Sequence, residues 1–389
     1  MPVFKYGAAG FYKRMKSFAE DATGSSQVEI IVSDILDAIE TSGDTALFKI
    51  TKKLDGAKLN SKSLRVSEAE LKAGEKSLSV KDRKAIRGAI KNVQLFNRES
   101  LPKNWSKKNL HGANVGEHYY PIRRVGIYVP GGTVPLVSTV VMTTTLAKIA
   151  KVPEICVCTP PTAEGEIAPA MAGVLSMCGI KEVYKIGGAQ AIAAMAYGTK
   201  SVSSVDKIYG PGNAYVNEAK RQLFGRVGID LLPGPSELMV VADASAQPRF
   251  VAADLLAQAE HGSGKERVYL VSTSDKLIEA VNRSLKEQLP KLSHKDAITK
   301  VLKKNFAIIP VPNLEAAVDV ANFIAPEHME LQVEPNKIAH LSNAITTAGA
   351  ILQGRYSATA LGDFAAGPSH ELPTGRAGRF LSGLTISDF

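Results

Sequence analysis

Residues 124–132, which read RVGIYVPGG, decide the fold class of this chain. The run from Arg124 to Val129 is mostly apolar and β-branched, which is typical of a strand buried on both faces. The glycine turn that ends this run is followed by a helical pattern from about Leu136 to Lys148. Strand, glycine turn and helix together form the repeating unit of a parallel α/β sheet.

The same unit recurs along the chain. Further strands are predicted at 154–158, 182–186 and 206–209, with helices at 168–177, 189–196 and after Asn213. A second series has strands at 238–241, 267–271 and 306–309, and helices at 250–260, 275–289 and 314–323. Amphipathic helices at 28–39 and 81–97 precede both series. The sequence therefore predicts an α/β protein with two helix-covered, mostly parallel sheets and an N-terminal helical segment.

The composition is that of an ordinary globular enzyme, with 45% hydrophobic and 22% charged residues. The formal charge of +9 comes from residues 1–124, which carry 23 Lys and Arg against 14 Asp and Glu, while the remainder carries 24 of each. These lysines follow amphipathic helices without interleaved aromatic residues, which favours a solvated surface over a polyanion site. We therefore expect no nucleic-acid partner.

Neither a membrane segment nor a cysteine-based metal site is predicted. No apolar run reaches the roughly 18 to 20 residues that span a bilayer, and the first residues lack a long hydrophobic leader, so we expect a cytoplasmic protein without membrane contact. The three cysteines, Cys156, Cys158 and Cys178, lie in apolar surroundings and lack nearby histidine partners. We expect them to be buried free thiols.

The seven histidines divide into two groups. Four lie in polar segments and are expected at the surface, namely His111, His118, His294 and His340. The other three each end a short motif at a predicted element boundary, namely His261, His328 and His370. The second group is where chemistry is expected.

Gln258 and His261 are three residues apart on a predicted helix, so they share a face. An amide oxygen, an imidazole and a carboxylate from elsewhere, such as Asp363, would suit Zn²⁺ with positions left open for substrate. On spacing alone, a histidine that interacts with the negative end of the helix dipole is the better-supported interpretation.

Glu327 and His328 follow Pro326 at the predicted end of a helix. An imidazole titrates near neutral pH and can take a hydroxyl proton, while the adjacent carboxylate can handle a second proton or a water molecule. A surface ion pair is an equally good interpretation of the spacing.

The glycine turns could hold a nucleotide, although the dinucleotide fingerprint G-x-G-x-x-G is absent. Its nearest match, residues 210–215, has Tyr215 in place of the third glycine. Three such turns at strand ends of one sheet favour backbone N–H contacts to phosphate or sugar, whereas any single turn could be a tight connection without a ligand. Ligands in such folds lie at the carboxyl ends of the strands, in the crevice that two lobes would leave.

Eight motifs together resemble the histidinol dehydrogenase family, in this order: VGIYVPGG, IGGAQAIAA, VDKIYGPGN, EAKRQ, GPSE, DLLAQAEHG, APEH and GDFAAGPSHELPT. The resemblance runs from about Val28 to the last residue. It implies oxidation of L-histidinol through an aldehyde to L-histidine with two NAD⁺ and one zinc ion per site, in a homodimer. It also implies two incomplete Rossmann-like domains, one discontinuous: residues 1–24 would be an N-terminal segment, 25–127 and 237–389 one α/β domain, and 128–236 the NAD-binding domain.

The resemblance assigns a role to each candidate residue. It implies that Glu327 and His328 are the acid/base pair. It implies that zinc is bound by Gln258, His261 and Asp363. The substrate contacts that it implies are these three residues together with Ser236 and His370. The implied NAD contacts are Tyr128, Gln190 and Asn213.

Two departures from the family pattern bear on these roles. Family members often carry Pro-Glu where this chain has Ala358-Thr359, so a nearby carboxylate would be missing. They also continue beyond Phe389 into a small tail with a glutamate and a histidine, the latter completing the zinc site of the partner subunit. The 389-residue chain is therefore expected to bind zinc weakly and to turn over slowly. The alternatives are a related NAD- and zinc-dependent dehydrogenase for another small polar alcohol, and a non-catalytic member.

Overall fold

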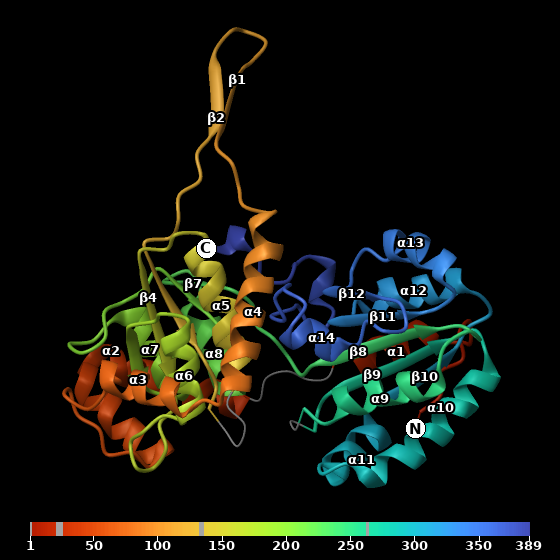
Figure 1. The fold of residues 1–389 in the computed structure, drawn as a ribbon, viewed down its shortest axis with the longest axis horizontal. Coiled ribbons are helices and arrows are strands. Elements are labelled where there is room, and N and C mark those ends of the chain that lie inside the picture. Colours follow the sequence, from red (N-terminus) through yellow and green to blue (C-terminus); the bar gives the residue numbers. More distant parts are fainter. Residues whose placement is uncertain (1, 21–25, 132–135, 262–263) are drawn as a thin grey trace. The chain divides into compact units, whose positions relative to one another are not determined.

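The computed structural model describes residues 2–20, 26–131, 136–261 and 264–389, and these form two compact units (Figure 1). Unit 1 comprises Met1–Thr23, Pro233–Asp363 and Leu372–Gly383. Unit 2 comprises Gly24–Leu232, Phe364–Glu371 and Leu384–Phe389. Each unit is built around a five-stranded sheet covered by helices, which confirms the predicted fold class.

The unit 2 sheet contains five parallel strands in the order β5-β4-β3-β6-β7. These are β3 (Arg124–Tyr128), β4 (Glu154–Thr159), β5 (Glu182–Lys185), β6 (Lys207–Tyr209) and β7 (Gly228–Ile229). The order reproduces the first five strands of a Rossmann sheet. All five residues of β3 are buried, as the apolar run predicts. The predicted glycine turn after β3 extends to Gly132, which lies outside the described residues.

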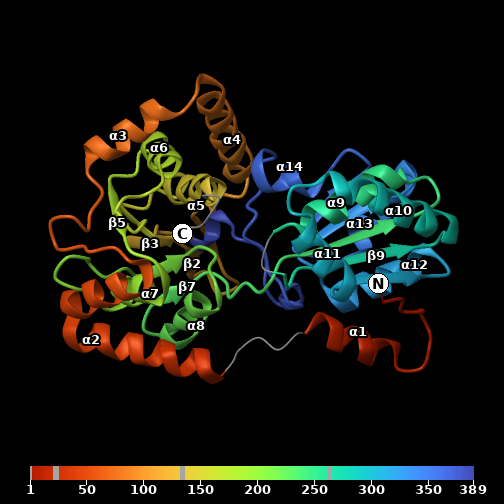
Figure 2. The same cartoon turned by 90° about the horizontal axis from the view of Figure 1, so that it is seen from below.

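Helices cover both faces of this sheet (Figure 2). One face carries α2 (Ser26–Asp55), α7 (Gly188–Tyr197) and α8 (Ala214–Leu223). The other carries α3 (Glu68–Ser77), α4 (Val80–Arg98), α5 (Val137–Ile149) and α6 (Pro169–Met177). The apolar stripe of α2 buries Val32, Leu36 and Ile39, and the helix is interrupted at Gly43, where φ is +50°.

The N-terminal helices therefore belong with the sheet of 128–236, whereas we predicted that 25–127 would share a domain with 237–389. Close helix packing accounts for this difference. A Cβ added to Gly74 of α3 would lie 2.6 Å from the Ala172 Cβ of α6, and one added to Gly173 would lie 2.8 Å from the Gly74 carbonyl oxygen. Only glycine at both positions allows α3 and α6 to pack so closely.

The unit 1 sheet repeats the same parallel order, β10-β9-β8-β11-β12. Its strands are β8 (Glu237–Ala242), β9 (Arg267–Ser272), β10 (Phe306–Pro310), β11 (His328–Gln332) and β12 (Ala350–Gln353). One face carries α9 (Pro248–Ala259), α10 (Asp275–Gln288) and α11 (Lys295–Lys304), and the other carries α1 (Phe11–Ala19), α12 (Leu314–Ile324) and α13 (Pro335–Ala344). The chain continues from β12 into α14 (Thr359–Phe364), and 3₁₀ turns occur at Leu289–Lys291, Ala377–Arg379 and Ile386–Asp388.

The first twenty residues are part of unit 1 and do not form a separate segment. Val3 pairs in parallel with Ile308 of β10, and Phe11 and Met15 of α1 are buried in the core of unit 1. Residues 2–20 of the predicted segment 1–24 are thus held by both backbone pairing and apolar burial, and the rest of that segment lies outside the described residues.

Unit 2 also carries a hairpin that the sequence did not predict. It consists of β1 (Trp105–Lys108) and β2 (Asn114–Glu117), paired antiparallel, and every residue of both strands is exposed. Figure 1 shows the hairpin extending away from the helices of its own unit. No helix of the described ranges is long and apolar enough to cross a membrane.

Candidate active site

The candidate residues of unit 1 collect at the amino edge of its sheet. His328 is the first residue of β11, and Ser236 directly precedes β8. Because α9 connects the parallel strands β8 and β9, its C-terminal end, with Gln258 and His261, returns to this edge. We expected the site walls at the carboxyl edge of the strands, whereas the structure places these candidate residues at the opposite edge.

Glu327 and His328 are buried, with exposed fractions of 6% and 5%, which excludes the surface ion pair. The main chain of Glu237 holds both: its N–H donates to Glu327 Oε2 (2.8 Å), and its carbonyl accepts from His328 Nδ1 (3.2 Å). His328 Nε2 donates to Asp363 Oδ1 at 3.2 Å. Both ring nitrogens therefore face acceptors, an arrangement that requires the protonated imidazolium.

The charges around this pair agree with that protonation state. Burial lowers the pKa of His328, but the negative charges of Glu327 and Asp363 outweigh burial and raise it to about 9. Burial raises the pKa of Glu327, against the opposing effect of His328. Burial and the charge of Glu327 also raise the pKa of Glu237 to about 8, although Arg267 lies 3.6 Å from its carboxylate. The sequence motif GPSE contained Glu237, but nothing in the spacing indicated that it lies beside residues 327 and 328.

Gln258 and His261 lie together at the end of α9, as predicted. Gln258 Nε2 is 3.3 Å from His261 Nδ1, which is also 3.3 Å from the Gln258 carbonyl oxygen. The second contact is the helix-end interaction that the spacing alone favoured. Gln258 Oε1 is buried and accepts no hydrogen bond within the described part of the chain. Burying an amide oxygen without a hydrogen-bond donor costs free energy and is uncommon in folded proteins. A bound cation would interact with that oxygen and offset the cost.

Asp363 lies in unit 1 with the other two candidate ligands, rather than across a crevice from them. It contacts His328, and the charges of both Asp363 and His261 act on Glu327. Among the described residues, no three His, Cys, Asp or Glu side chains are grouped as a metal site, and the predicted ligand set contains only two side chains of these types. The oxygen, nitrogen and oxygen donors are chemically suited to zinc.

The candidate NAD residues of unit 2 lie at the carboxyl edge of its sheet. Tyr128 ends β3, and its hydroxyl accepts the Gly188 N–H at 3.1 Å. Gln190, fully buried in α7, donates from Nε2 to Asp55 Oδ2 at 3.0 Å, while its Oε1 accepts no hydrogen bond from a described residue. Burial raises the pKa of Asp55 to about 6, against the effect of Gln190. Asp55 is a member of this group that the sequence did not indicate.

The remaining candidates have more ordinary surroundings. The Asn213 side chain caps α8 by accepting from the N–H groups of Tyr215 (3.0 Å) and Val216 (3.1 Å). Ser236 is half-buried and accepts the Arg267 N–H through its carbonyl at 3.0 Å. His370 is half-buried in the Phe364–Glu371 segment of unit 2.

The predictions for the other histidines and the cysteines are confirmed. The four histidines expected at the surface are exposed. The three cysteines are free and buried, and burial raises the pKa of Cys156 to about 12, so its thiol is unreactive at neutral pH.

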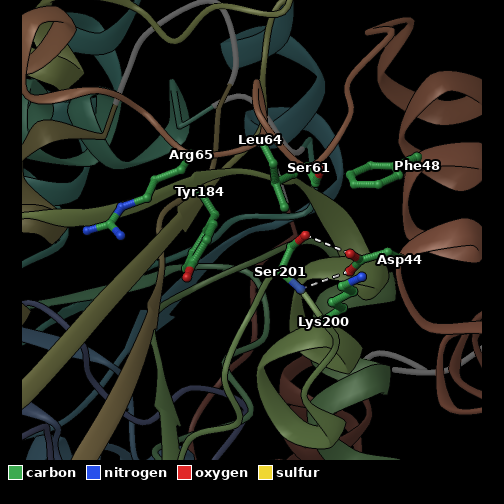
Figure 3. Close-up of a pocket in the computed structure, with 8 residues that line it drawn as sticks. All are labelled: Asp44, Phe48, Ser61, Leu64, Arg65, Tyr184, Lys200 and Ser201. Carbon is green, nitrogen blue, oxygen red and sulfur yellow. Dashed lines mark hydrogen bonds between the residues drawn. The ribbon is translucent and has the colours of Figure 1, made fainter.

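A cavity of about 420 Å³ in unit 2 is separate from these groups. Figure 3 shows Asp44 of α2 in its wall, accepting hydrogen bonds from the Ser201 N–H (3.2 Å) and hydroxyl (2.6 Å). None of the predicted site residues lines this cavity.

Comparison with known proteins gives a consistent result. A family model for histidinol dehydrogenase matches residues 19–389. The histidinol dehydrogenase of Symbiobacterium thermophilum is 42% identical over 365 residues, which is 93% of this chain and 82% of that protein. That of Aromatoleum aromaticum is 41% identical over 372 residues, 95% of this chain and 84% of that protein. The crystal structure of histidinol dehydrogenase from Elizabethkingia anophelis superimposes with a TM-score of 0.95 at 35% identity, covering 100% of this chain and 88% of that one.

Proposed function

The chain belongs to the histidinol dehydrogenase family and is therefore an oxidoreductase, and we propose that it oxidises L-histidinol through the aldehyde to L-histidine with NAD⁺ and zinc. The proposed reaction belongs to histidine biosynthesis, and we propose that the protein carries it out in the cytoplasm. The observation that carries the proposal is the buried Glu327–His328 pair, whose imidazole contacts Asp363. A buried imidazole between two carboxylates suits proton transfer at an alcohol.

Gln258, His261 and Asp363 are the residues that would hold zinc. The unpaired, buried Gln258 Oε1 supports this assignment. When bound, zinc would hold the amino and imidazole nitrogens of the substrate, and NAD⁺ would accept the hydride. Ser236 and His370 are the further substrate contacts that we propose.

His328 takes the proton of the alcohol in the first oxidation. As the imidazolium that donates to Asp363, His328 cannot act as a base, so it must first release its Nε2 proton to solvent and give up this contact before it takes the proton of the alcohol. Glu327 takes a proton from the water that attacks the aldehyde in the second oxidation. The Glu237 N–H fixes one Glu327 oxygen and leaves the other available for that proton.

Tyr128, Gln190 and Asn213 are the proposed NAD contacts. They lie at the carboxyl edge of a Rossmann-type sheet, which is where such sheets bind dinucleotides. The unpaired Gln190 Oε1 supports this assignment, since a buried acceptor without a donor suits a ligand hydroxyl or amide.

A homodimer is part of the proposal, and the exposed hairpin of unit 2 supports it. A two-stranded hairpin is marginally stable in water. This one exposes Trp105, Val115 and Leu110, and the Leu110 side chain is fully accessible to solvent. Contact with a second copy would cover such side chains.

The decisive experiment is an assay of the purified protein with L-histidinol, NAD⁺ and Zn²⁺, in which NADH and L-histidine are both measured. The proposal requires two NADH per histidine formed. Turnover of another small polar alcohol, with none of L-histidinol, would identify a related dehydrogenase instead. NADH formation that stops at the aldehyde would contradict the role of Glu327.

A further inference from the structure

Unit 2 contains a buried lysine that the proposed reaction does not use. The Lys220 side chain, on α8, is fully buried and forms an ion pair with Asp230, which follows β7 and has an exposed side-chain fraction of 2%. A buried charge pair is costly unless its remaining donors and acceptors are satisfied. Their other partners therefore indicate what the pair does.

The first partner is the glycine turn that follows β6. The Gly210 N–H donates to Asp230 Oδ2 at 2.7 Å, and the Gly210 carbonyl accepts from Lys220 Nζ at 3.0 Å. Gly210 has φ +110°, and an added Cβ would lie 2.0 Å from the carbonyl oxygen of Tyr128. The ion pair thus fixes both backbone polar groups of Gly210, which begins the turn to Asn213 in a conformation that only glycine adopts readily.

The second partner is Glu371, which directly follows His370. Burial, followed by the charge of Asp230, raises the pKa of Glu371 well above its usual range, and Lys220 opposes this only in part. The Asp230 carboxylate is already stabilised by Lys220 and by the Gly210 N–H, so Glu371, whose charge is opposed by that of Asp230, is the carboxyl group that stays protonated. One lysine then balances one carboxylate, and no second negative charge is buried.

The main chain of Glu371 is fixed as well. Its carbonyl accepts the Leu384 N–H at 2.8 Å, and its N–H donates to Ser369 Oγ at 3.1 Å. The segment that carries His370 is therefore attached to the glycine turn through Glu371 and Asp230.

We propose that Lys220, Asp230 and Glu371 are positioning residues that hold the Gly210–Asn213 turn and the His370 segment in one frame. This rests on the proposed function, in which Asn213 contacts NAD and His370 contacts the substrate. Cofactor and substrate affinity are then coupled through a single hydrogen-bonded group inside unit 2. Neither Lys220 nor Glu371 touches the reacting atoms.

Two variants of Glu371 test this proposal. Glu371→Leu keeps approximately the volume but cannot donate to Asp230, whereas Glu371→Gln keeps a donor. We expect Glu371→Leu to raise both the NAD dissociation constant and the KM for L-histidinol about tenfold, the size of one lost hydrogen bond to a charged group, with a smaller change in kcat. Glu371→Gln should restore both constants to within about twofold of the unchanged chain.

Asp230→Asn is the second variant, for the case in which Glu371→Leu does not fold, and it should raise both constants together. A folded Glu371→Leu or Asp230→Asn with unchanged constants would overturn the proposal. So would an effect on only one of the two ligands, or a Glu371→Gln variant as impaired as Glu371→Leu. Failure of the unsubstituted chain to bind NAD or oxidise L-histidinol would instead contradict the proposed function, before any variant is compared.

Discussion

Asp254 and Glu330 share a hydrogen bond behind the candidate active site of unit 1. Asp254 lies one helical turn before Gln258 on α9, and Glu330 lies two residues after His328 on β11. Burial, and then the charge of Glu330, raise the pKa of Asp254 to about 8. Glu330 Oε1 also accepts the N–H (2.8 Å) and hydroxyl (2.7 Å) of Thr359, at the start of α14. Thr359 thus makes a contact of its own where family members often have a glutamate.

The first prediction concerns the pH dependence of stability at Asp254. Because its pKa is raised on folding, its stabilising contribution is fully present below about pH 4 and is lost as the pH rises towards 8. Asp254→Asn cannot lose a proton and can still donate to Glu330. We expect the variant to gain on the order of 1 kcal/mol over the unchanged chain between pH 5 and pH 8, after allowance for solvent screening.

Urea unfolding followed by circular dichroism at several pH values measures this difference. Asp243→Asn is the contrasting control, because hydrogen bonds from Ser245 and Glu334 and the ion pair with Lys337 lower the pKa of Asp243 despite burial. Asp243→Asn should be destabilising at neutral pH and less so in acid. Parallel stability curves for the unchanged chain and Asp254→Asn would show that the Asp254 proton is not bound more tightly in the folded state.

The second prediction separates the two members of the acid/base pair. His328→Ala should lower the rate of alcohol oxidation about 10² to 10⁴-fold, and Glu327→Gln should act mainly on aldehyde oxidation, because each group moves a proton in a different step. Single-turnover measurements that start from L-histidinol and from the aldehyde distinguish the steps. If both variants slowed only the same half-reaction, the division of roles would be wrong.

The fold was predictable where burial leaves a periodic signal. The strand at 124–128 and its repeats stand out because buried parallel strands are nearly all apolar. β11 was missed because its sequence, HMELQ, contains Glu330 and Gln332, which are buried and hydrogen-bonded to other polar groups. The hairpin was missed because both its faces are exposed and no alternation arises. Amphipathicity indicated that α2 buries a face, but not which sheet it covers.

In the candidate site, too, contacts between residues close in the sequence were predictable and contacts between distant residues were not. Gln258 and His261, three residues apart on a helix, could be paired from the sequence because the spacing itself brings them together. Glu237 meets Glu327 across 90 residues, and Asp55 meets Gln190 across 135. Such pairs depend on strand order, and no local pattern encodes it.

The third prediction tests the glycine turn after β6. Gly210→Ala places a Cβ against the Tyr128 carbonyl oxygen in addition to the strain of a positive φ. Gly225→Ala is the matched control, since its φ is +101° and nothing lies within 4 Å of the added Cβ. We expect a loss of about 1 to 2 kcal/mol for Gly225→Ala and at least twice that for Gly210→Ala, measured by thermal unfolding. Equal losses would mean that Tyr128 moves away freely.

The last prediction concerns the buried amide oxygens of Gln258 and Gln332, neither of which has a hydrogen-bond donor among the described residues. Replacing such a group by leucine removes an unsatisfied acceptor, so Gln258→Leu and Gln332→Leu should each change the stability of the metal-free protein by less than about 1 kcal/mol. The two substitutions should differ in their effect on the affinity for zinc. Gln332 ends β11, at the opposite end of that strand from His328, whereas Gln258 lies beside His261.

Loss of one ligand typically weakens a metal site by about 10- to 100-fold or more, so calorimetric titration with Zn²⁺ should show that decrease for Gln258→Leu and no change for Gln332→Leu. The measurement does not depend on catalysis, so it tests the ligand assignment even if turnover is slow. Unchanged zinc affinity in Gln258→Leu would remove Gln258 from the site and leave its contact with His261 as a helix-end interaction alone. An equal decrease in both variants would point to a general change in unit 1, since Gln332 lies too far along β11 to bind the same ion as His261.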